Sequence, residues 1–69
     1  MAWGLDFNGR LAIKQMVDNL ESSSEIKKTI SRLVRPNDFD YEANEALARY
    51  LEERGYQSVA QYLRDLLHR

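Results

Sequence analysis

The stretch KKTISRLVRP, residues 27–36, decides the fold of this chain, because it can form either a helix or a strand. In a helix, the apolar residues recur at i, i+4, i+7 and i+8 and share one face, which consists of Ile26, Ile30, Leu33 and Val34. A strand would mix polar and apolar side chains on both of its faces. The pattern therefore predicts a helix that ends ahead of Pro36, because the residue before a proline is pushed out of the α region.

The start of this helix is marked by a capping box. Ser22 and Glu25 stand three residues apart, the spacing at which each side chain can bond the other's backbone amide. One helix therefore begins near Ser23, and the preceding helix ends near Leu20.

The preceding helix covers NGRLAIKQMVDNL, residues 8–20, where apolar residues again recur at helical spacing. Asn8 is its predicted N-cap, and Lys14 and Asp18 are expected to pair on its outer side. The apolar residues at the start of the chain are predicted to fold over the core as a plug; they are Trp3, Leu5 and Phe7.

A third helix is predicted after Pro36, with Asp38 or Asp40 as its N-cap. Gly55 fits the left-handed position that follows a helix C-terminus. Glu45 and Arg49 are expected to pair on the outer side. The apolar face consists of Phe39, Ala43, Ala46, Leu47, Tyr50 and Leu51.

The last helix is predicted to begin at Ser58 as its N-cap, with Gln61 at capping-box spacing. Its apolar face consists of Val59, Tyr62, Leu63, Leu66 and Leu67. With no internal repeat or linker, residues 1–69 form one small all-α domain of four helices, which ends in a helical hairpin.

The composition predicts association with a partner. A domain of 69 residues without cysteine has no disulfide or thiolate zinc site to stabilise it, so oligomerisation is expected. The partners expected are a second copy, in a homodimer, and another protein. The last two helices carry the longest apolar faces, which predicts a dimer or partner interface made of Leu47, Tyr50, Leu51, Tyr56, Val59, Tyr62, Leu63 and Leu66.

Features of an enzyme or a metal site are missing from the sequence. The one histidine, His68, is next to the last residue, no base is placed to activate Ser22–Ser24, and the three glycines are isolated. We therefore expect no catalytic residue, no cofactor, no metal and no small-molecule substrate. Without a secretory signal or a membrane-length apolar run, a soluble cytoplasmic protein is expected, with no membrane contact.

One charge pattern indicates an anion-binding surface. Lys28, Arg32 and Arg35 recur at i, i+4 and i+7, with Lys27 beside them, whereas the third helix is acidic. The basic face can contact DNA phosphate or an acidic protein, or it can simply be solvated. The near-neutral net charge of −1 adds no long-range attraction to nucleic acid.

The tail LEERGYQSVAQYLRDLLHR, residues 51–69, resembles the C-terminal half of ribbon-helix-helix repressors and antitoxins of the Arc, CopG and ParD type. There, Gly-Tyr ends one helix and a serine caps the next, the places held here by Gly55, Tyr56 and Ser58. The resemblance implies DNA-phosphate contacts at residues 58–60. It also implies a strand near residues 28–35 that pairs with its twin in a dimer and reads bases through Arg32 and Arg35.

The same residues also resemble the LisH dimerisation motif, in which L-x-x-L-I-x-x-Y-L is followed by Gly-Tyr and a later small residue. The matching positions are Ala46, Leu47, Tyr50, Leu51, Gly55, Tyr56, Ala60 and Leu63. This resemblance implies a helical hairpin that dimerises into a four-helix bundle.

Two functions follow from these patterns. The first is a non-enzymatic regulatory protein that dimerises through its C-terminal hairpin and acts by protein–protein binding. The second is a small dimeric DNA-binding regulator or antitoxin of the ribbon-helix-helix type. The helical period of residues 26–34 and the near-neutral charge favour the first.

Overall fold

The computed structural model describes residues 3–36 and 40–69, and this part of the chain is mostly helical. Its four helices are α1 (Phe7–Asp18), α2 (Ser23–Leu33), α3 (Tyr41–Glu53) and α4 (Gln57–Leu67). Two short strands, β1 (Trp3–Gly4) and β2 (Arg35–Pro36), pair antiparallel, with Trp3 opposite Pro36. The prediction of a small helical domain with four helices is confirmed, whereas the two-stranded sheet was not predicted.

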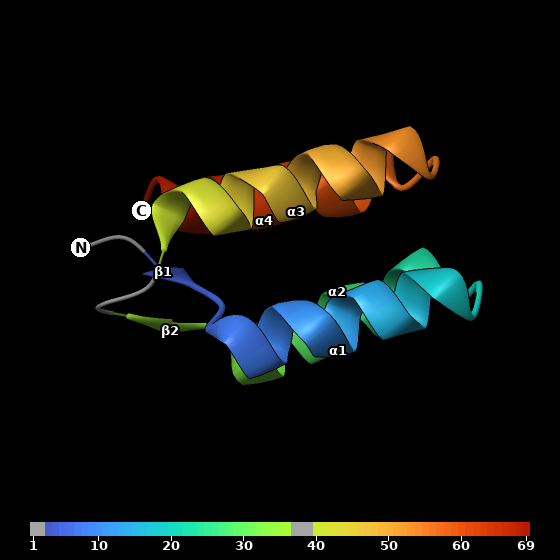
Figure 1. Ribbon diagram of the computed structural model, residues 1–69, viewed down its shortest axis with the longest axis horizontal. Helices are drawn as coiled ribbons and strands as arrows, with labels where there is room; N and C mark the ends of the chain where they lie inside the picture. The colour runs from blue at the N-terminus through green and yellow to red at the C-terminus, as the bar shows by residue number, and fades with distance from the viewer. Residues whose placement is uncertain (1–2, 37–39) are drawn as a thin grey trace.

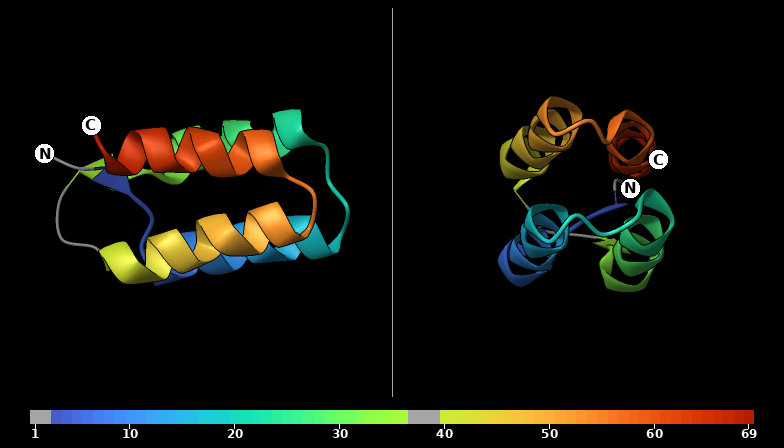
Figure 2. Two further views of the ribbon diagram at one scale, coloured as in Figure 1. Left: turned by 90° about the horizontal axis from the view of Figure 1, so that it is seen from above. Right: turned by 90° about the vertical axis from the view of Figure 1, so that its right-hand side faces the viewer.

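The helices form two hairpins that stack on each other. The α1–α2 hairpin makes one layer and the α3–α4 hairpin the other, with the strands at one end and both hairpin turns at the opposite end (Figure 1). Seen end-on in Figure 2, the four helices occupy the corners of a square, with α1 beside α3 and α2 beside α4. Each hairpin therefore covers the apolar face of the other.

Residues 28–33 belong to a helix, so the strand that the alternative fold places near 28–35 does not form over them. The helix forms because its apolar residues share one face, on which Ile26 and Ile30 are completely buried. Of residues 28–35, only Arg35, beyond the end of α2, is in a strand, and it pairs with Gly4 of the same chain.

Both hairpin turns use the same backbone motif. After α3, Gly55 adopts a φ of +88°, and the Tyr56 amide donates to the Leu51 carbonyl at 2.8 Å. After α1, Leu20 adopts a φ of +59°, and the Glu21 amide donates to a carbonyl one turn back at 3.0 Å. These are the bonds of a Schellman motif, which confirms the prediction for Gly55 and reveals a left-handed leucine at the matching position.

Substitutions at these two positions should act in opposite directions. Gly55→Ala is expected to lower the free energy of unfolding by about 1 kcal/mol, because a side chain disfavours the left-handed region. Leu20→Gly removes the same strain from a side chain that is 83% exposed, and should leave stability unchanged or raise it by up to about 1 kcal/mol. Urea unfolding measures both changes, and equal losses from the two variants would contradict the shared motif.

Two of the predicted helix caps are confirmed and two are wrong. Ser22 accepts from the Glu25 amide at 3.2 Å, and Asp40 accepts from the Ala43 amide at 3.0 Å. The cap of α1 is Asp6 rather than Asn8, because the chain is still extended at Asp6 and its carboxylate accepts from the Gly9 amide. The helix α4 begins directly after the Gly55 turn, so Ser58 lies inside its first turn, and Tyr56 at the N-cap position makes no side-chain cap bond.

The core lies between the two hairpins. The predicted plug is confirmed for Leu5, which is fully buried, and for Trp3, which packs against the core, but not for Phe7, which is 67% exposed. Ala46, which was predicted to lie on the apolar face of the third helix, is exposed as well. Phe39, predicted on the same face, lies outside the described residues. The buried hydrophobic residues are Leu5, Ile13, Val17, Ile26, Ile30, Leu47, Ala48, Leu51, Val59, Ala60, Leu63, Leu66 and Leu67.

One buried residue of this core is polar. Asn44 is fully buried in α3, and its Oδ1 accepts from the Leu5 amide at 2.8 Å. Its Nδ2 donates to the Leu5 and Asp40 carbonyls, at 2.9 Å in each case. The side chain therefore pairs both backbone groups of Leu5 and fixes the start of the chain against α3.

Candidate functional site

The side chains predicted to form a dimer interface serve mainly as the core of a single chain. Five of them are buried between the two hairpins: Leu47, Leu51, Val59, Leu63 and Leu66. In this fold the α1–α2 hairpin already occupies the face that a partner was expected to cover. These five side chains therefore pack within one chain here, and both the predicted interface and dimerisation stay predictions.

The three tyrosines of the predicted interface are half-buried and join the two hairpins. The Tyr50 hydroxyl donates to Asp18 Oδ1 at 2.6 Å, and the Tyr56 hydroxyl donates to the Glu21 carbonyl at 2.7 Å. The hydroxyl of Tyr62 is hydrogen-bonded to that of Ser31. Each tyrosine thus packs its ring on the core while its hydroxyl reaches the other hairpin.

The bond to Tyr50 also replaces a predicted ion pair. Asp18 contacts the Tyr50 hydroxyl and, at 3.4 Å, Arg54, rather than Lys14. The Lys14 ammonium lies instead 5.5 Å from the centre of the Tyr50 ring. The hydrogen bond to Asp18 holds the pKa of Tyr50 above its ordinary value of 10.0, because the carboxylate stabilises the protonated phenol.

A second charged cluster joins α3 to α4. Arg64 Nε donates to Glu45 Oε1 at 2.8 Å, and its terminal nitrogens donate to both oxygens of Glu52, at 2.6 and 3.2 Å. Helical spacing predicted that Glu45 would pair with Arg49, but Glu45 pairs with Arg64 instead. The hydrogen bonds to Arg64 lower the pKa of Glu52, and those same bonds raise the pKa of Arg64.

This cluster gives the protein a predictable dependence on pH. Because the pKa of Glu52 is lower in the folded chain, its contribution to stability is present above its ordinary pKa of 4.5 and is lost as the pH falls through the folded value. Glu52→Gln should therefore flatten the loss of stability on acidification below about pH 4.5. Thermal melts of both proteins from pH 7 to pH 3 measure this, and parallel curves would contradict it.

A groove runs between α1 and α3 and is the candidate interaction site. It has a volume of about 260 Å³ and is lined by Phe7, Arg10, Leu11, Lys14, Ala43, Ala46 and Leu47. The two alanines explain the groove, because their single methyl groups leave space where longer side chains of α3 would meet α1. Sequence reasoning missed this site because it assigned Phe7 and Ala46 to the core.

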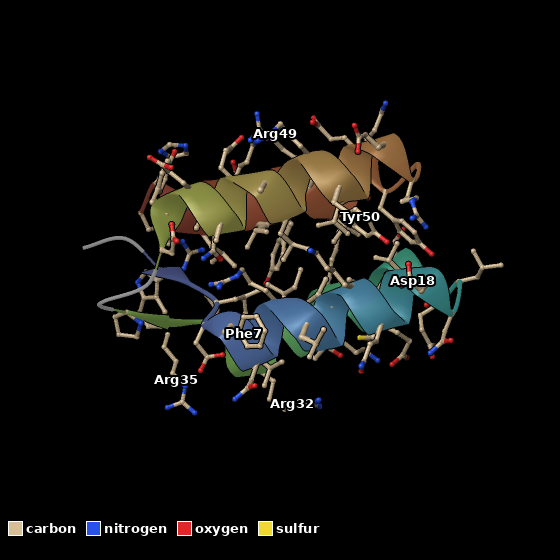
Figure 3. All side chains as sticks on the ribbon, viewed as in Figure 1. Phe7, Asp18, Arg32, Arg35, Arg49 and Tyr50 are labelled. Atoms are coloured by element: carbon tan, nitrogen blue, oxygen red, sulfur yellow. The ribbon has the colours of Figure 1, made fainter. Side chains whose placement is uncertain are left out.

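The groove has an exposed apolar border on α1. Phe7 is 67% and Leu11 is 44% exposed, and they stand four residues apart on one side of the helix. In Figure 3 the Phe7 ring lies on the face of α1 that is turned towards the viewer. Phe7 and Leu11 thus form an exposed apolar surface beside the groove.

The predicted basic residues are only partly brought together. Arg32 and Arg35 point away from the α3–α4 layer into solvent (Figure 3). Lys28 is exposed on the same side, four residues before Arg32, and its Nζ lies 3.8 Å from Glu25. Lys27 is half-buried and lies about 100° further round the helix, so it is not part of this basic surface.

Neither a metal-binding cluster nor a membrane-spanning helix is found in residues 3–36 and 40–69. These residues contain no group of three or more His, Cys, Asp or Glu side chains that could hold a metal ion. None of their helices combines the length and apolar character that crossing a bilayer requires.

Comparison of the chain with protein-family models, with curated proteins and with solved structures finds no match. The groove between α1 and α3 is thus identified from geometry alone.

Proposed function

We propose that this protein is a non-enzymatic interaction module that binds an amphipathic helix of a partner protein in the groove between α1 and α3. The observation that carries the proposal is the exposure of Phe7 and Leu11 beside this groove. Both side chains are large and apolar, and 67% of Phe7 and 44% of Leu11 are exposed.

A helix is the occupant that this groove fits best. Its walls are two helices, and the apolar border from Phe7 to Leu11 spans about 6 Å, or one helical turn. At about 260 Å³ the groove is smaller than a usual small-molecule pocket, but it has room for a few apolar side chains of a partner. Helix-in-groove recognition places such side chains at i, i+3, i+4 and i+7.

The test starts from a photo-crosslinking residue, p-benzoylphenylalanine, in place of Phe7 in the native host. A matched protein carries it in place of Glu53, an exposed residue at the end of α3 that does not line the groove. We expect a protein that crosslinks from position 7 and not from position 53. That partner is then purified, and its affinity is measured by calorimetry.

The purified partner should bind Phe7→Ser/Leu11→Ser at least tenfold more weakly than the unchanged protein, because the variant removes the apolar border. Glu53→Ser is the matched control and should bind normally. Equal affinity for all three proteins, or no crosslink from position 7, would contradict the proposal.

A second candidate function is phosphate contact with duplex DNA by the basic surface of α2. The observation in its favour is that Arg32 and Arg35 extend into solvent on the same side (Figure 3). The helical conformation of residues 28–33 removes the strand through which ribbon-helix-helix proteins read bases, which favours the interaction module. The test is whether the protein binds a random DNA duplex at low salt. If it does, and if Lys28→Glu/Arg32→Glu/Arg35→Glu abolishes that binding, DNA contact replaces the interaction module as the proposed function.

A further inference from the structure

We infer that the helix bound in the groove is acidic along the side that faces α1, and that it belongs to another protein rather than to a second copy of this chain. The inference rests on the proposed function and adds the chemistry of the partner. Its basis is the arrangement of Arg10 and Lys14 beside the apolar border.

Both cations of the groove come from α1. The Arg10 guanidinium lies 5.9 Å from the centre of the Phe7 ring and donates to the Leu5 carbonyl at 3.0 Å. The Lys14 ammonium lies 5.5 Å from the centre of the Tyr50 ring. Within the described residues, neither cation forms an ion pair with a carboxylate.

The nearby acidic side chains do not balance this charge. Asp6, one turn before Arg10, caps α1 by accepting from the Gly9 amide at 2.8 Å. Asp18, one turn beyond Lys14, is already bonded to Tyr50 and Arg54. On α3, Arg49 points away from α1 (Figure 3), and Glu42, seven residues earlier, shares its side of the helix. The charged side chains that line the groove are therefore the two cations alone.

The spacing of the cations sets the pattern expected in the partner. Arg10 and Lys14 are four residues apart, or about 6 Å along the axis of α1. A helix lying along α1 would meet both with carboxylates four residues apart, while its apolar side chains meet Phe7 and Leu11. Such charge complementarity selects partners and steers their encounter.

The same charges argue against a second copy as the occupant. A two-fold symmetric contact sets the same surface patch against itself. Two such grooves would bring together Arg10 and Lys14 from both copies, with no carboxylate among the lining residues. Like charges in a desolvated contact are unfavourable, so a self-complementary pairing through this groove is disfavoured.

Two synthetic helical peptides test the inference. They share leucines at i, i+4 and i+7, and they differ only in the residues flanking the leucines on one side, which are glutamates in one peptide and lysines in the other. We expect the glutamate peptide to bind at least tenfold more tightly by calorimetry. When this peptide binds, the amide chemical shifts of the protein should change most around Phe7, Leu11 and Ala46.

Charge reversal provides the decisive comparison. Arg10→Glu/Lys14→Glu should reverse the preference, so that the lysine peptide binds more tightly. Lys28→Glu/Arg32→Glu makes the same change in net charge on the outer side of α2 and should leave the preference for glutamate intact.

The outcomes separate the inference from the proposed function. Equal binding of both peptides in the groove would overturn the acidic partner and leave the groove as a helix-binding site. Binding of neither peptide would overturn both. A dimer that Phe7→Ser converts to a monomer would overturn the inference in favour of a second copy.

Discussion

Asn44→Asp is expected to lower the free energy of unfolding by more than about 3 kcal/mol at pH 7, although the two side chains have nearly the same shape. Asn44 is fully buried and donates to the Leu5 and Asp40 carbonyls. A carboxylate at this position would place a charge against both carbonyl oxygens, and each buried group left unpaired costs roughly 1–3 kcal/mol. Urea unfolding measures the difference.

The pH dependence of Asn44→Asp identifies the cause. Burial raises the pKa of the new carboxyl in the folded chain above its unfolded value of about 3.9, so the folded state favours the protonated form. The difference in stability from the unchanged protein should therefore shrink as the pH falls from the raised folded pKa towards about 3.9, and it should be smallest and constant below that, where the neutral carboxyl can donate one hydrogen bond. A difference that stays constant from pH 7 to pH 3 would contradict burial of this side chain.

Leu63→Ala is expected to lower the free energy of unfolding by about 2–5 kcal/mol, because Leu63 is fully buried and its truncation leaves a cavity. Leu11→Ala removes the same atoms from a side chain that is 44% exposed, and the loss should be well under that of Leu63→Ala. Unfolding by urea, followed by circular dichroism, compares the two variants.

The concentration dependence of these unfolding curves adds a second test. A core built within one chain gives a midpoint that does not change with protein concentration, whereas a core shared between chains gives one that rises with it. We expect no shift for Leu63→Ala over a hundredfold range of concentration. A rising midpoint would indicate that Leu63 packs against a second copy.

Helical periodicity in the sequence correctly predicted much of the helical structure. The stripe from Ile26 to Val34 predicted α2 correctly, because a buried helix face requires apolar residues every three to four positions. Gly55 predicted the end of α3 for an equally local reason, since few other residues adopt a positive φ without cost.

Periodicity could not say which surface covers each stripe. The faces of α3 and α4 were assigned to a partner, but the α1–α2 hairpin of the same chain covers them. An apolar stripe shows that one face of a helix is buried, but it does not show which surface covers that face. The hydrogen bonds of Tyr50, Tyr56 and Tyr62 link the hairpins, and each joins residues more than 30 positions apart in the sequence.

The centre of the α3 face was also misplaced, for a reason visible in the sequence. Asn44 stands three, four and seven residues before Leu47, Ala48 and Leu51, the spacing of one helical face. As a polar residue it was left out of the stripe, which shifted the predicted face towards Ala46. Because of that shift the groove was not predicted, since Ala46 is exposed and lines the groove.

The α3–α4 hairpin packs on the α1–α2 hairpin of its own chain, and we propose that this packing leaves the groove beside Phe7 as the surface for a partner. Isotope-filtered NOE spectroscopy on an equal mixture of labelled and unlabelled protein tests it most directly. We predict that contacts from the Tyr50 and Tyr56 rings to Asp18 and Glu21 appear in the fully labelled sample and are absent from the filtered spectrum of the mixture. The same contacts in the filtered spectrum would show that the hairpins pair between chains, and would contradict the claim.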